Sequence, residues 1–393
     1  MKILHTVEFY SPSVGGAQEV VKQLSEHLVA LGHDVTVATT KLRDRKKRVI
    51  NGVKIREFDI SGNAVRGYHG KDILKYQKFL LQGKYDVMMN YAAQQWATDL
   101  AFEVIDQIKC RKILVPCGFS GLYNHDYIAY FKKMPAVLKK YDHSVYLSHE
   151  YRDIDFAKKH HIKNTCVIPN GADEREFSQI DSQQINNFRK KYNLSLDSSL
   201  ILNVSNHTGT KGHHETIEVF RKANYPNATL MIVGDINLSA GCYRECMRSA
   251  WIYNHFWRHL SLSNNRIIVT KLDRHDTITA YHAADLFLFL SNIECSPLVL
   301  FESSASGTPF LASSAGNSQE IASWTGCGLT SQCTTSKHGF TTANTLKYAK
   351  ELANLMKNES KRRKMSFDGI RSWKSKYTWE KIAKSYEKLY KKS

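Results

Sequence analysis

The strongest constraint on the fold is a short apolar run, Leu286–Leu290, that stops abruptly at polar residues. An uninterrupted apolar run of this length predicts a strand buried on both faces, as in a parallel sheet. Glu294 follows, and Pro297 suits the first turn of a helix because its missing N–H would have no partner there. We therefore expect a strand, a loop and a helix, with Glu294 past the carboxyl end of the strand, where open α/β sheets bind ligands.

A second acid, Glu302, lies further along the predicted helix. The free N–H groups at a helix start favour anionic ligands. Two carboxylates beside such groups suit a ligand that is both polyhydroxylated and phosphorylated. An ordinary helix start with two solvated acids is the alternative, and spacing alone does not separate the two.

Strands and helices alternate along the whole chain. Lys2–Phe9 predicts a first strand, a loop with Gly15 and Gly16 follows, and apolar residues then recur at helical spacing. Further predicted strands of the first half are Asp34–Thr39, Val53–Phe58, Val87–Asn90, Lys112–Pro116, Ser144–Leu147 and Thr165–Pro169. Those of the second half are Leu200–Val204, Thr229–Val233, Ile267–Thr270 and Leu286–Leu290. This alternation predicts an α/β protein with a boundary near residue 170.

The segment from Glu294 to Glu302, with the small residues Ala305, Gly307 and Pro309 after it, resembles the Glu-x7-Glu motif of retaining glycosyltransferases of family 4 (glycosyl transferases group 1). Other landmarks agree in order and spacing, so the resemblance covers nearly the whole chain. It implies two Rossmann-like domains facing across a cleft, the GT-B architecture. The implied parts are an N-terminal acceptor-side domain (1–169), a C-terminal nucleotide-sugar-binding domain (170–372) and a C-terminal helix (373–393) that packs on the first domain.

The resemblance also implies a donor site. Glu294 and Lys211 take the catalytic roles: Glu294 borders the transferred sugar, and Lys211 supplies positive charge to the departing nucleoside diphosphate. Glu302 resembles the acid that holds the ribose hydroxyls. The expected donor-binding residues are Gly16, Asn206, Lys211, Ser296, Pro297, Leu298, Val299 and Glu302. Gly316–Ile321 resembles a weaker landmark that follows the motif.

Two positions depart from the family pattern. Asn206 stands where the family has an arginine, so another group (His207, His213, His214 or a lysine) would have to meet the second phosphate charge. Cys117 stands where many members have a histidine that contacts the sugar. The expected acceptor or sugar-side residues are Gly15, Cys117, Tyr123 and His125.

The implied reaction transfers a sugar from a UDP- or GDP-linked donor to a hydroxyl, with retention, in surface polysaccharide or glycoconjugate synthesis. Front-face attack needs no enzyme nucleophile, only positioning and stabilisation of the leaving diphosphate; double displacement through a carboxylate is the other route. The sequence has no aspartate-rich metal motif, and we expect no cofactor and no metal. The alternatives are a transferase acting on nucleic acid or protein, and a degenerate protein that only binds sugar nucleotides.

Charge and cysteines bear on location and partners. The formal charge of +18 implies an acidic partner: a phosphorylated substrate, an anionic membrane or nucleic acid. Phe131–Lys140 mixes apolar residues with four lysines, which is typical of a short helix on an anionic membrane. No apolar stretch reaches the roughly 18–20 residues that span a bilayer. The scattered cysteines include no Cys-x-x-Cys pair, and no histidine pair is evident near Cys242 and Cys246, so we expect free thiols and a cytoplasmic location, with contact at the inner membrane face as an option.

Overall fold

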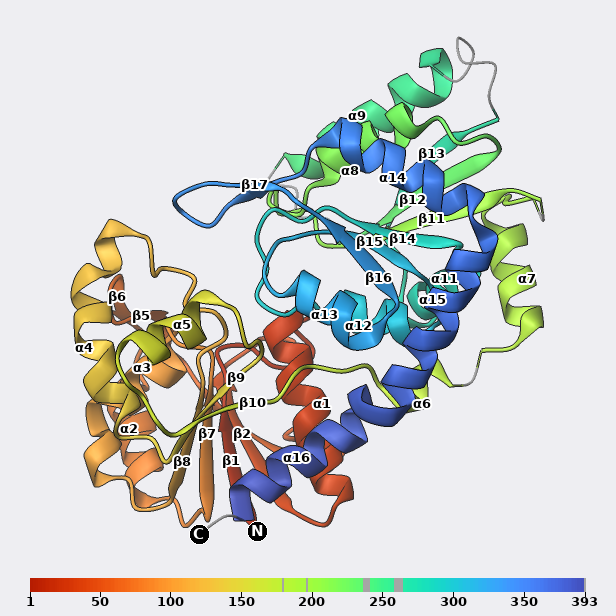
Figure 1. The fold of residues 1–393 in the computed structure, drawn as a ribbon. Helices are drawn as coiled ribbons and strands as arrows, with labels where there is room; N and C mark the ends of the chain where they lie inside the picture. Colours follow the sequence, from red (N-terminus) through yellow and green to blue (C-terminus); the bar gives the residue numbers. More distant parts are fainter. Residues whose placement is uncertain (179, 196, 236–240, 258–263, 392–393) are drawn as a thin grey trace. The chain divides into compact units, whose positions relative to one another are not determined.

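The computed structural model describes residues 1–178, 180–195, 197–235, 241–257 and 264–391 (Figure 1). The chain divides into two compact units. Unit 1 comprises Met1–Asn170 and Trp379–Ser393, and unit 2 comprises Gly171–Thr378. Each unit is a mainly parallel sheet with helices on both faces, as the alternation of the sequence predicts (Figure 1).

The sheet of unit 1 has eight strands in the order β10-β9-β8-β7-β1-β2-β4-β3. Every pairing is parallel except that of β3 with β4. The strands are β1 (Lys2–Thr6), β2 (Asp34–Thr40), β3 (Val49–Ile50), β4 (Val53–Phe58), β7 (Val87–Tyr91), β8 (Arg111–Val115), β9 (His143–Tyr146) and β10 (Thr165–Val167), with a separate hairpin of β5 (Ser61–Asn63) and β6 (Gly67–His69). The helices are α1 (Gly16–Ala30), α2 (Ile73–Gln82), α3 (Trp96–Val104), η1 (Ile105–Gln107), η2 (His125–Tyr127), α4 (Ile128–Leu138), α5 (Arg152–Lys159) and α16 (Trp379–Lys391).

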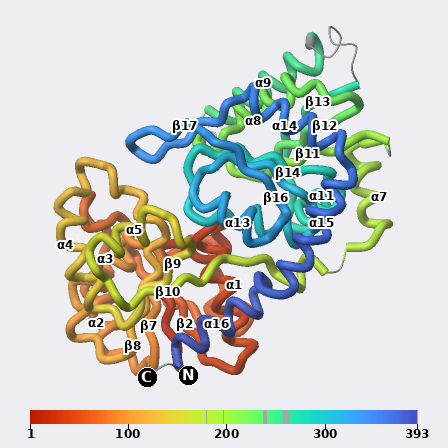
Figure 2. The backbone as a smooth tube through the Cα atoms, in the orientation of Figure 1, coloured from red at the N-terminus to blue at the C-terminus, as the bar shows by residue number. Residues whose placement is uncertain are grey.

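The C-terminal helix α16 belongs to unit 1 and packs beside α1 (Figures 1 and 2). Its apolar face, with Ile382, Tyr386 and Leu389, is buried as the helical spacing predicts. The hydroxyl of Tyr390 lies 3.1 Å from Nε2 of His5 in β1, which ties the helix to the centre of the sheet.

The predicted C-terminal segment begins too early. Trp373–Tyr377 (η5) belongs to unit 2, where the indole of Trp373 donates to the carbonyl of Ala172 at 3.0 Å. Only the chain from Trp379 onward packs in unit 1. The buried Trp373 explains the difference, because its hydrogen bond to Ala172 holds Trp373–Tyr377 in unit 2.

The apolar residues of the basic cluster at Phe131–Lys140 point into unit 1. Phe131, Met134 and Leu138 are buried in its core cluster. The membrane helix expected there therefore lacks its apolar face, and the pattern is that of an ordinary amphipathic helix whose lysines face solvent. Within the described residues, none of the helices is both long and apolar enough to cross a bilayer.

The sheet of unit 2 is wholly parallel, with the order β13-β12-β11-β14-β15-β16. The strands are β11 (Ser199–Val204), β12 (Ala228–Val233), β13 (Arg266–Thr270), β14 (Leu286–Phe289), β15 (Phe310–Ser313) and β16 (Gly328–Ser331), with a separate hairpin of β17 (Thr334–Thr335) and β18 (Thr341–Thr342). The described helices are α6 (Glu174–Phe177), α7 (Ser182–Lys191), α8 (His213–Ala223), α9 (Cys242–Ile252), η4 (Tyr253–Trp257), α11 (Arg274–Ala283), α12 (Leu298–Ala305), α13 (Ser318–Thr325), α14 (Thr345–Lys357), α15 (Glu359–Ser372) and η5.

Strand β14 shows why the apolar run must lie inside this sheet. Phe287 and Phe289 pack in the core on one face, whereas Leu286, Leu288 and Leu290 pack in the core on the other. Both faces of the strand are therefore covered, as predicted. The sheet continues beyond the strands that the sequence predicts, through β15 and the half-buried β16.

Candidate functional site

The strand order of unit 2 reverses between β11 and β14, which lie side by side although β12 and β13 separate them in sequence. Such a switch point leaves a crevice at the carboxyl ends of the strands, because the two following connections run to opposite faces. The loop after β11 and the loop after β14 both start here. They are joined by a backbone hydrogen bond from the N–H of Asn292 to the carbonyl of Thr210 at 3.0 Å.

Lys211 and Glu294 meet at this point. The Nζ atom of Lys211 lies 2.6 Å from Oε1 of Glu294, and the hydroxyl of Ser291 donates to the same oxygen at 2.8 Å. The Lys211 side chain is 26% exposed and that of Glu294 11%, so the ion pair is partly shielded from solvent. A cation held by one carboxylate in a half-buried position is ready to interact with an incoming anion.

Two glycines hold the backbone of these loops in place. Gly212 has φ +64°, and a Cβ there would lie 1.8 Å from the carbonyl oxygen of Leu290. Gly316 has φ +61°, and a Cβ would lie 2.8 Å from the backbone carbonyl of Glu294. A side chain at Gly212 would collide with the end of β14, and one at Gly316, in the loop after β15, would collide with the backbone of Glu294.

Helix α12 begins next to Glu294, at Leu298, with Pro297 immediately before it. The predicted start is therefore right to within one residue. The N–H groups of Leu298 and Val299 belong to the first turn, where an α-helix provides no internal acceptors. Together with Ser296, they form the edge of the loop at which a phosphate would be favoured.

Glu302, one turn further along α12, is buried and bonded to an arginine that the sequence analysis did not identify. NH1 of Arg274 lies 2.7 Å from Oε1 of Glu302, and Nε of the same guanidinium lies 3.1 Å from Glu176. Burial would lower the pKa of Arg274, but the two carboxylates outweigh it and hold the pKa above its usual range. Nothing in the sequence near Arg274 indicates this contact, because the partners come from three separate helices.

Asn206 occupies a turn. Its side-chain oxygen accepts the N–H of Asp235 at 3.3 Å, and its carbonyl accepts that of Thr208 at 2.9 Å. The side chain is exposed. It provides a hydrogen-bonding amide where the family pattern has a cation.

The histidines considered as substitutes for the missing arginine differ from one another. His207 and His213 are buried, and burial lowers the pKa of both, that of His213 to about 4. They are therefore neutral near pH 7 and supply no positive charge. Only His214 is exposed to solvent.

The structure also corrects the view that no histidine pair lies near Cys242 and Cys246. His207 and His213 come from the loop after β11 and the start of α8, and both lie against Cys242. The sequence analysis missed this cluster because the histidines and cysteines are far apart along the chain.

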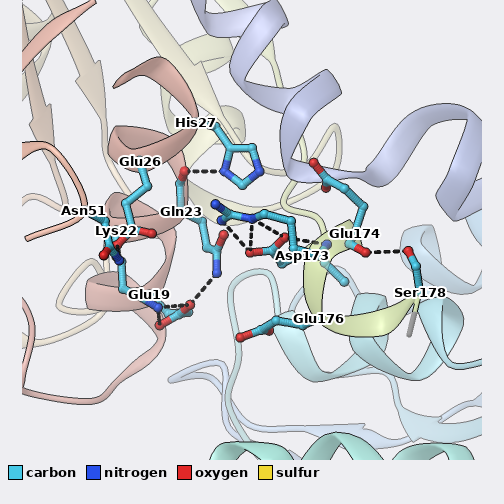
Figure 3. A network of polar contacts seen from close by, with 12 residues as sticks. Glu19, Lys22, Gln23, Glu26, His27, Asn51, Asp173, Glu174, Glu176 and Ser178 are labelled. Carbon is cyan, nitrogen blue, oxygen red and sulfur yellow. Dashed lines mark hydrogen bonds and ion pairs between the residues drawn. The ribbon is translucent and has the colours of Figure 1, made fainter. Parts of the chain in front are cut away.

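In unit 1, Gly15 and Gly16 stand at the start of α1, after β1. A Cβ added to Gly16 would meet no atom within 4 Å, so the space beside its backbone is open. Glu19 in the next turn accepts from Gln23 at 2.8 Å and from Lys22 at 3.2 Å (Figure 3). These contacts orient the acid that follows the glycine pair. Gly16 leaves open space, whereas a Cβ at Gly15 would lie 2.6 Å from the side chain of Gln18.

Cys117 lies after the carboxyl end of β8, in a run of left-handed backbone. The φ angles are 58° at Cys117, 90° at Gly118 and 45° at Phe119. The run is held by Asp153, whose carboxylate accepts the N–H of Gly118 at 2.8 Å, and by Arg152, which donates to the carbonyl of Gly118 at 2.8 Å. A left-handed backbone conformation costs free energy at a non-glycine residue. Residues held in it are found preferentially at binding and active sites.

The other two predicted residues of this unit lie on the surface. Tyr123 is 46% exposed, with the guanidinium of Arg152 5.8 Å from its ring centre. His125 begins the short helix η2 and is exposed. Because β1 and β8 are parallel strands of one sheet, the loops that carry Gly15 and Cys117 lie along the same edge.

Comparisons with known proteins agree with this geometry. The model of "Glycosyltransferase Family 4" matches residues 14–176, and that of "Glycosyl transferases group 1" matches residues 184–371. The chain is 24% identical over 402 residues to an N-acetyl-alpha-D-glucosaminyl L-malate synthase of Bacillus anthracis, covering 96% of this chain and 94% of the relative. It is 27% identical over 353 residues to the uncharacterized glycosyltransferase MJ1607 of Methanocaldococcus jannaschii, covering 82% of each.

Solved structures show the same fold. A glycosyltransferase from Rickettsia africae superposes with a TM-score of 0.79 at 17% identity, over 99% of this chain and 97% of the other. The Anabaena protein HepE, solved in complex with UDP, superposes with a TM-score of 0.77 at 14% identity, over 99% of each chain. WaaG, a glycosyltransferase involved in lipopolysaccharide biosynthesis, superposes with a TM-score of 0.70 at 16% identity, over the full length of both chains.

Proposed function

This chain belongs to the GT-B glycosyltransferases of family 4 (group 1), and we propose that it transfers a sugar, with retention, from a nucleotide-sugar donor to a hydroxyl of a glycan or glycolipid. The observation that carries the proposal is the Lys211–Glu294 pair at the switch point of unit 2, beside the N-terminus of α12. A cation and the first-turn amides of a helix suit a diphosphate, and a carboxylate suits the hydroxyls of a sugar ring. All three lie at the carboxyl ends of β11 and β14, and together they match the parts of a nucleotide-sugar.

The donor fits unit 2 part by part. Lys211 and the first-turn amides of α12 face the diphosphate, and Glu294 accepts hydrogen bonds from hydroxyls of the transferred sugar. Glu302 accepts the ribose hydroxyls. Arg274 holds Oε1 of Glu302 at 2.7 Å, which fixes the carboxylate in one orientation before the nucleotide arrives.

Catalysis then follows from positioning and charge. As the bond from the anomeric carbon to the phosphate oxygen lengthens, negative charge grows on the diphosphate, where Lys211 and the α12 amides stabilise it. The acceptor hydroxyl enters on the face from which the diphosphate leaves and gives its proton to a phosphate oxygen. This route requires no metal and no enzyme nucleophile, and it retains the anomeric configuration.

The acceptor is assigned to unit 1. Gly15, Cys117, Tyr123 and His125 all lie in loops that follow strands of its sheet, whereas the open backbone at Gly16 remains on the donor side. The exposed rings of Tyr123 and His125 suit a hydroxylated acceptor whose recognition relies on hydrogen bonds to loops.

The relatives narrow the first donors and acceptors to try. HepE has been solved with UDP and with UDP-glucose, which favours a UDP-sugar for this chain as well. The Bacillus relative is named for a product of N-acetylglucosamine and L-malate, so small hydroxy acids belong in the acceptor panel beside glycans and glycolipids.

The first experiment measures nucleotide release from UDP-, GDP-, ADP- and CMP-sugars, with thermal-shift binding alongside. One donor that stabilises the protein and releases nucleotide would support the proposal, and the anomeric proton coupling of the product would test retention. Tight nucleotide binding without turnover on any acceptor would point instead to a degenerate binding protein. If no donor acts in either assay, the proposal fails and the charge of +18 favours a polyanion-binding function.

We also propose that the protein works in the cytoplasm, with peripheral contact at an anionic membrane through its basic surface. The charge of +18 supports attraction, although the apolar side chains of α4 are used in the core. Sedimentation with anionic and neutral vesicles tests this: binding to anionic vesicles that salt abolishes is expected, and no binding at low salt would refute it.

A further inference from the structure

Four potential metal ligands converge in unit 2 beside the donor loops. His207 lies in the loop after β11, His213 begins α8, and Cys242 and Cys246 lie one turn apart on α9. All four side chains are buried, and their ligand atoms lie within 4.8 Å of one another. Clusters of exposed acids are common on protein surfaces because water solvates them. The two thiols and two imidazoles of this cluster are buried, so water does not solvate them.

The spacing of the ligand atoms fits one ion. The Sγ atom of Cys242 lies 3.4 Å from Nδ1 of His213 and 3.6 Å from Nδ1 of His207. In a tetrahedral zinc site, Zn–S bonds of about 2.3 Å and Zn–N bonds of about 2.0 Å place sulfur and nitrogen about 3.5 Å apart. The two observed separations lie within about 0.1 Å of that value, and the four ligand atoms all lie within 4.8 Å of one another.

Hydrogen bonding within the chain prepares His213 to be a ligand. Its Nε2 lies 2.9 Å from the hydroxyl of Ser205, and that hydroxyl donates to Oδ1 of Asn203 at 2.9 Å. The hydroxyl proton of Ser205 is donated to Asn203, so the hydroxyl oxygen accepts a hydrogen bond from Nε2–H of His213, and Nδ1 of His213 keeps its lone pair. A partner that fixes the ring tautomer in this way is the usual second contact of a metal-bound histidine.

Thiol hydrogen bonds leave one buried atom of the cluster unsatisfied. Cys242 can donate its proton to Nδ1 of His213 and accept one from Nδ1 of His207, but Nε2 of His207 is buried with no hydrogen-bond partner among the described residues.

We propose that His207, His213, Cys242 and Cys246 bind one Zn²⁺ ion. Two thiolates and two imidazoles are the donor set of closed structural zinc sites. The spacings, His-x5-His and Cys-x3-Cys, lie within the usual ranges for such sites, with the histidines before the cysteines. On binding, the rings of His207 and His213, now stacked at 16° with centroids 4.4 Å apart, must open so that both lone pairs point at the metal.

The role of the ion would be structural. Four protein ligands leave no open position, so the metal takes no part in sugar transfer, and the expectation that the protein has no metal is replaced without changing the proposed chemistry. His207 and His213 lie on either side of Lys211 and Gly212 in one connection. Metal binding would therefore fix the loop that carries Lys211 against helix α9.

The test is the metal content of the full chain, expressed with zinc in the medium and purified without chelators. We expect about one zinc per chain by elemental mass spectrometry. Cys246→Ser should reduce the content at least several-fold, as should His213→Gln. The control is Cys333→Ser, a half-buried thiol of the same unit that contacts Tyr348, and it should keep the wild-type content.

A second measurement does not depend on the variants folding. The wild-type chain, stripped of zinc with a chelator and reloaded with Co²⁺, should show thiolate-to-cobalt charge transfer and the visible bands of a tetrahedral site. Absence of these bands together with no zinc in the purified chain would overturn the proposal. Since neither measurement uses a sugar donor, failure here is distinguishable from failure of the proposed function.

Discussion

The loops of unit 2 that we propose for the donor and the loops of unit 1 that we propose for the acceptor both follow the strands of a mainly parallel sheet, but they are constructed differently. In unit 2 the charged residues are shielded and paired: Lys211 with Glu294, and Glu302 with Arg274. In unit 1 the corresponding loops have two glycines, a cysteine in left-handed backbone and exposed rings. A diphosphate is best bound by charges oriented in advance, because reorientation during the reaction costs free energy. A neutral hydroxylated acceptor makes no such demand.

The largest effect should come from removing the cation of unit 2. Lys211→Ala is expected to lower kcat about 10²-fold, because the growing charge on the diphosphate loses a preorganised partner. Donor KM should change much less. Steady-state kinetics with the best donor measure both values.

The matched control for this prediction is Lys191→Ala. That lysine also lies 2.6 Å from a carboxylate, Asp276, but the pair is on the surface of unit 2. It should leave kcat unchanged. Equal kinetics for the two variants would remove Lys211 from the catalytic site.

Unit 1 should be distinguished by its sensitivity to acid. His5 is fully buried between Ser25 and Tyr390, and burial lowers its pKa to about 3. The unfolded chain binds a proton on this ring near pH 6.5 and the folded chain does not, so stability is lost as pH falls below that value. At pH 5 the loss is about 2 kcal/mol.

His5→Gln should therefore flatten the dependence of the unfolding free energy on pH between 6.5 and 5, even if it lowers stability overall. Denaturant titrations at several pH values measure the slope. His69→Gln, at an exposed position of the same unit, is the control. A slope that is unchanged in His5→Gln would mean that another group dominates acid unfolding.

The next effect concerns the nucleotide. Glu302→Ala should weaken nucleotide binding about tenfold through the loss of charge-assisted hydrogen bonds to the ribose. Calorimetric titration with the matching nucleoside diphosphate measures it. Thermal unfolding without nucleotide is needed alongside, since Arg274 loses a partner as well.

Glu359→Ala provides the comparison for Glu302, because it removes an exposed acid that pairs with Arg363 on its own helix. It should bind nucleotide like the wild type. If Glu302→Ala is less stable yet binds nucleotide normally, Glu302 is a structural residue and not a ribose ligand.

The smallest effects are expected in the loops of unit 1. Tyr123→Ala and His125→Ala should each raise the acceptor KM about threefold, because each removes one exposed contact. Nucleotide affinity and donor hydrolysis should not change. A loss of nucleotide affinity in either variant would contradict the assignment of the donor to unit 2 and the acceptor to unit 1.

The sequence predicts those parts of the molecule that depend on local pattern. Leu286–Leu290 is buried on both faces, so its apolar run specifies a central strand, and Glu294 follows from its place after that strand. Lys211 is predicted by the family resemblance and not by its local pattern. The contact between Lys211 and Glu294 joins residues far apart in the chain, yet sheet topology alone brings them together. Strand β16 was missed because its residues show no clear alternation of apolar and polar side chains. It lies at the edge of the sheet, starts with Gly328 and is half-buried.

The contacts that sequence patterns do not predict are those between helices. Arg274 meets Glu302 only because α11 packs near α12, and neither residue has a local motif that indicates the other. The same holds for His213 and Cys242, which lie on different helices. Such pairs depend on how the elements are packed, which spacing along one element does not encode.

The position of α16 has a consequence for how the protein is made. The ribosome completes β10 and then all of unit 2 before it synthesises the helix that covers α1 and reaches His5. Throughout that interval the N-terminal unit exposes the apolar surface that Ile382, Tyr386 and Leu389 later cover, and we expect this surface to be accessible to chaperones and proteases. Stalled chains that end before Trp379 should therefore be digested faster in unit 1 than released full-length chains, and equal rates would show that the unit is stable without its last helix.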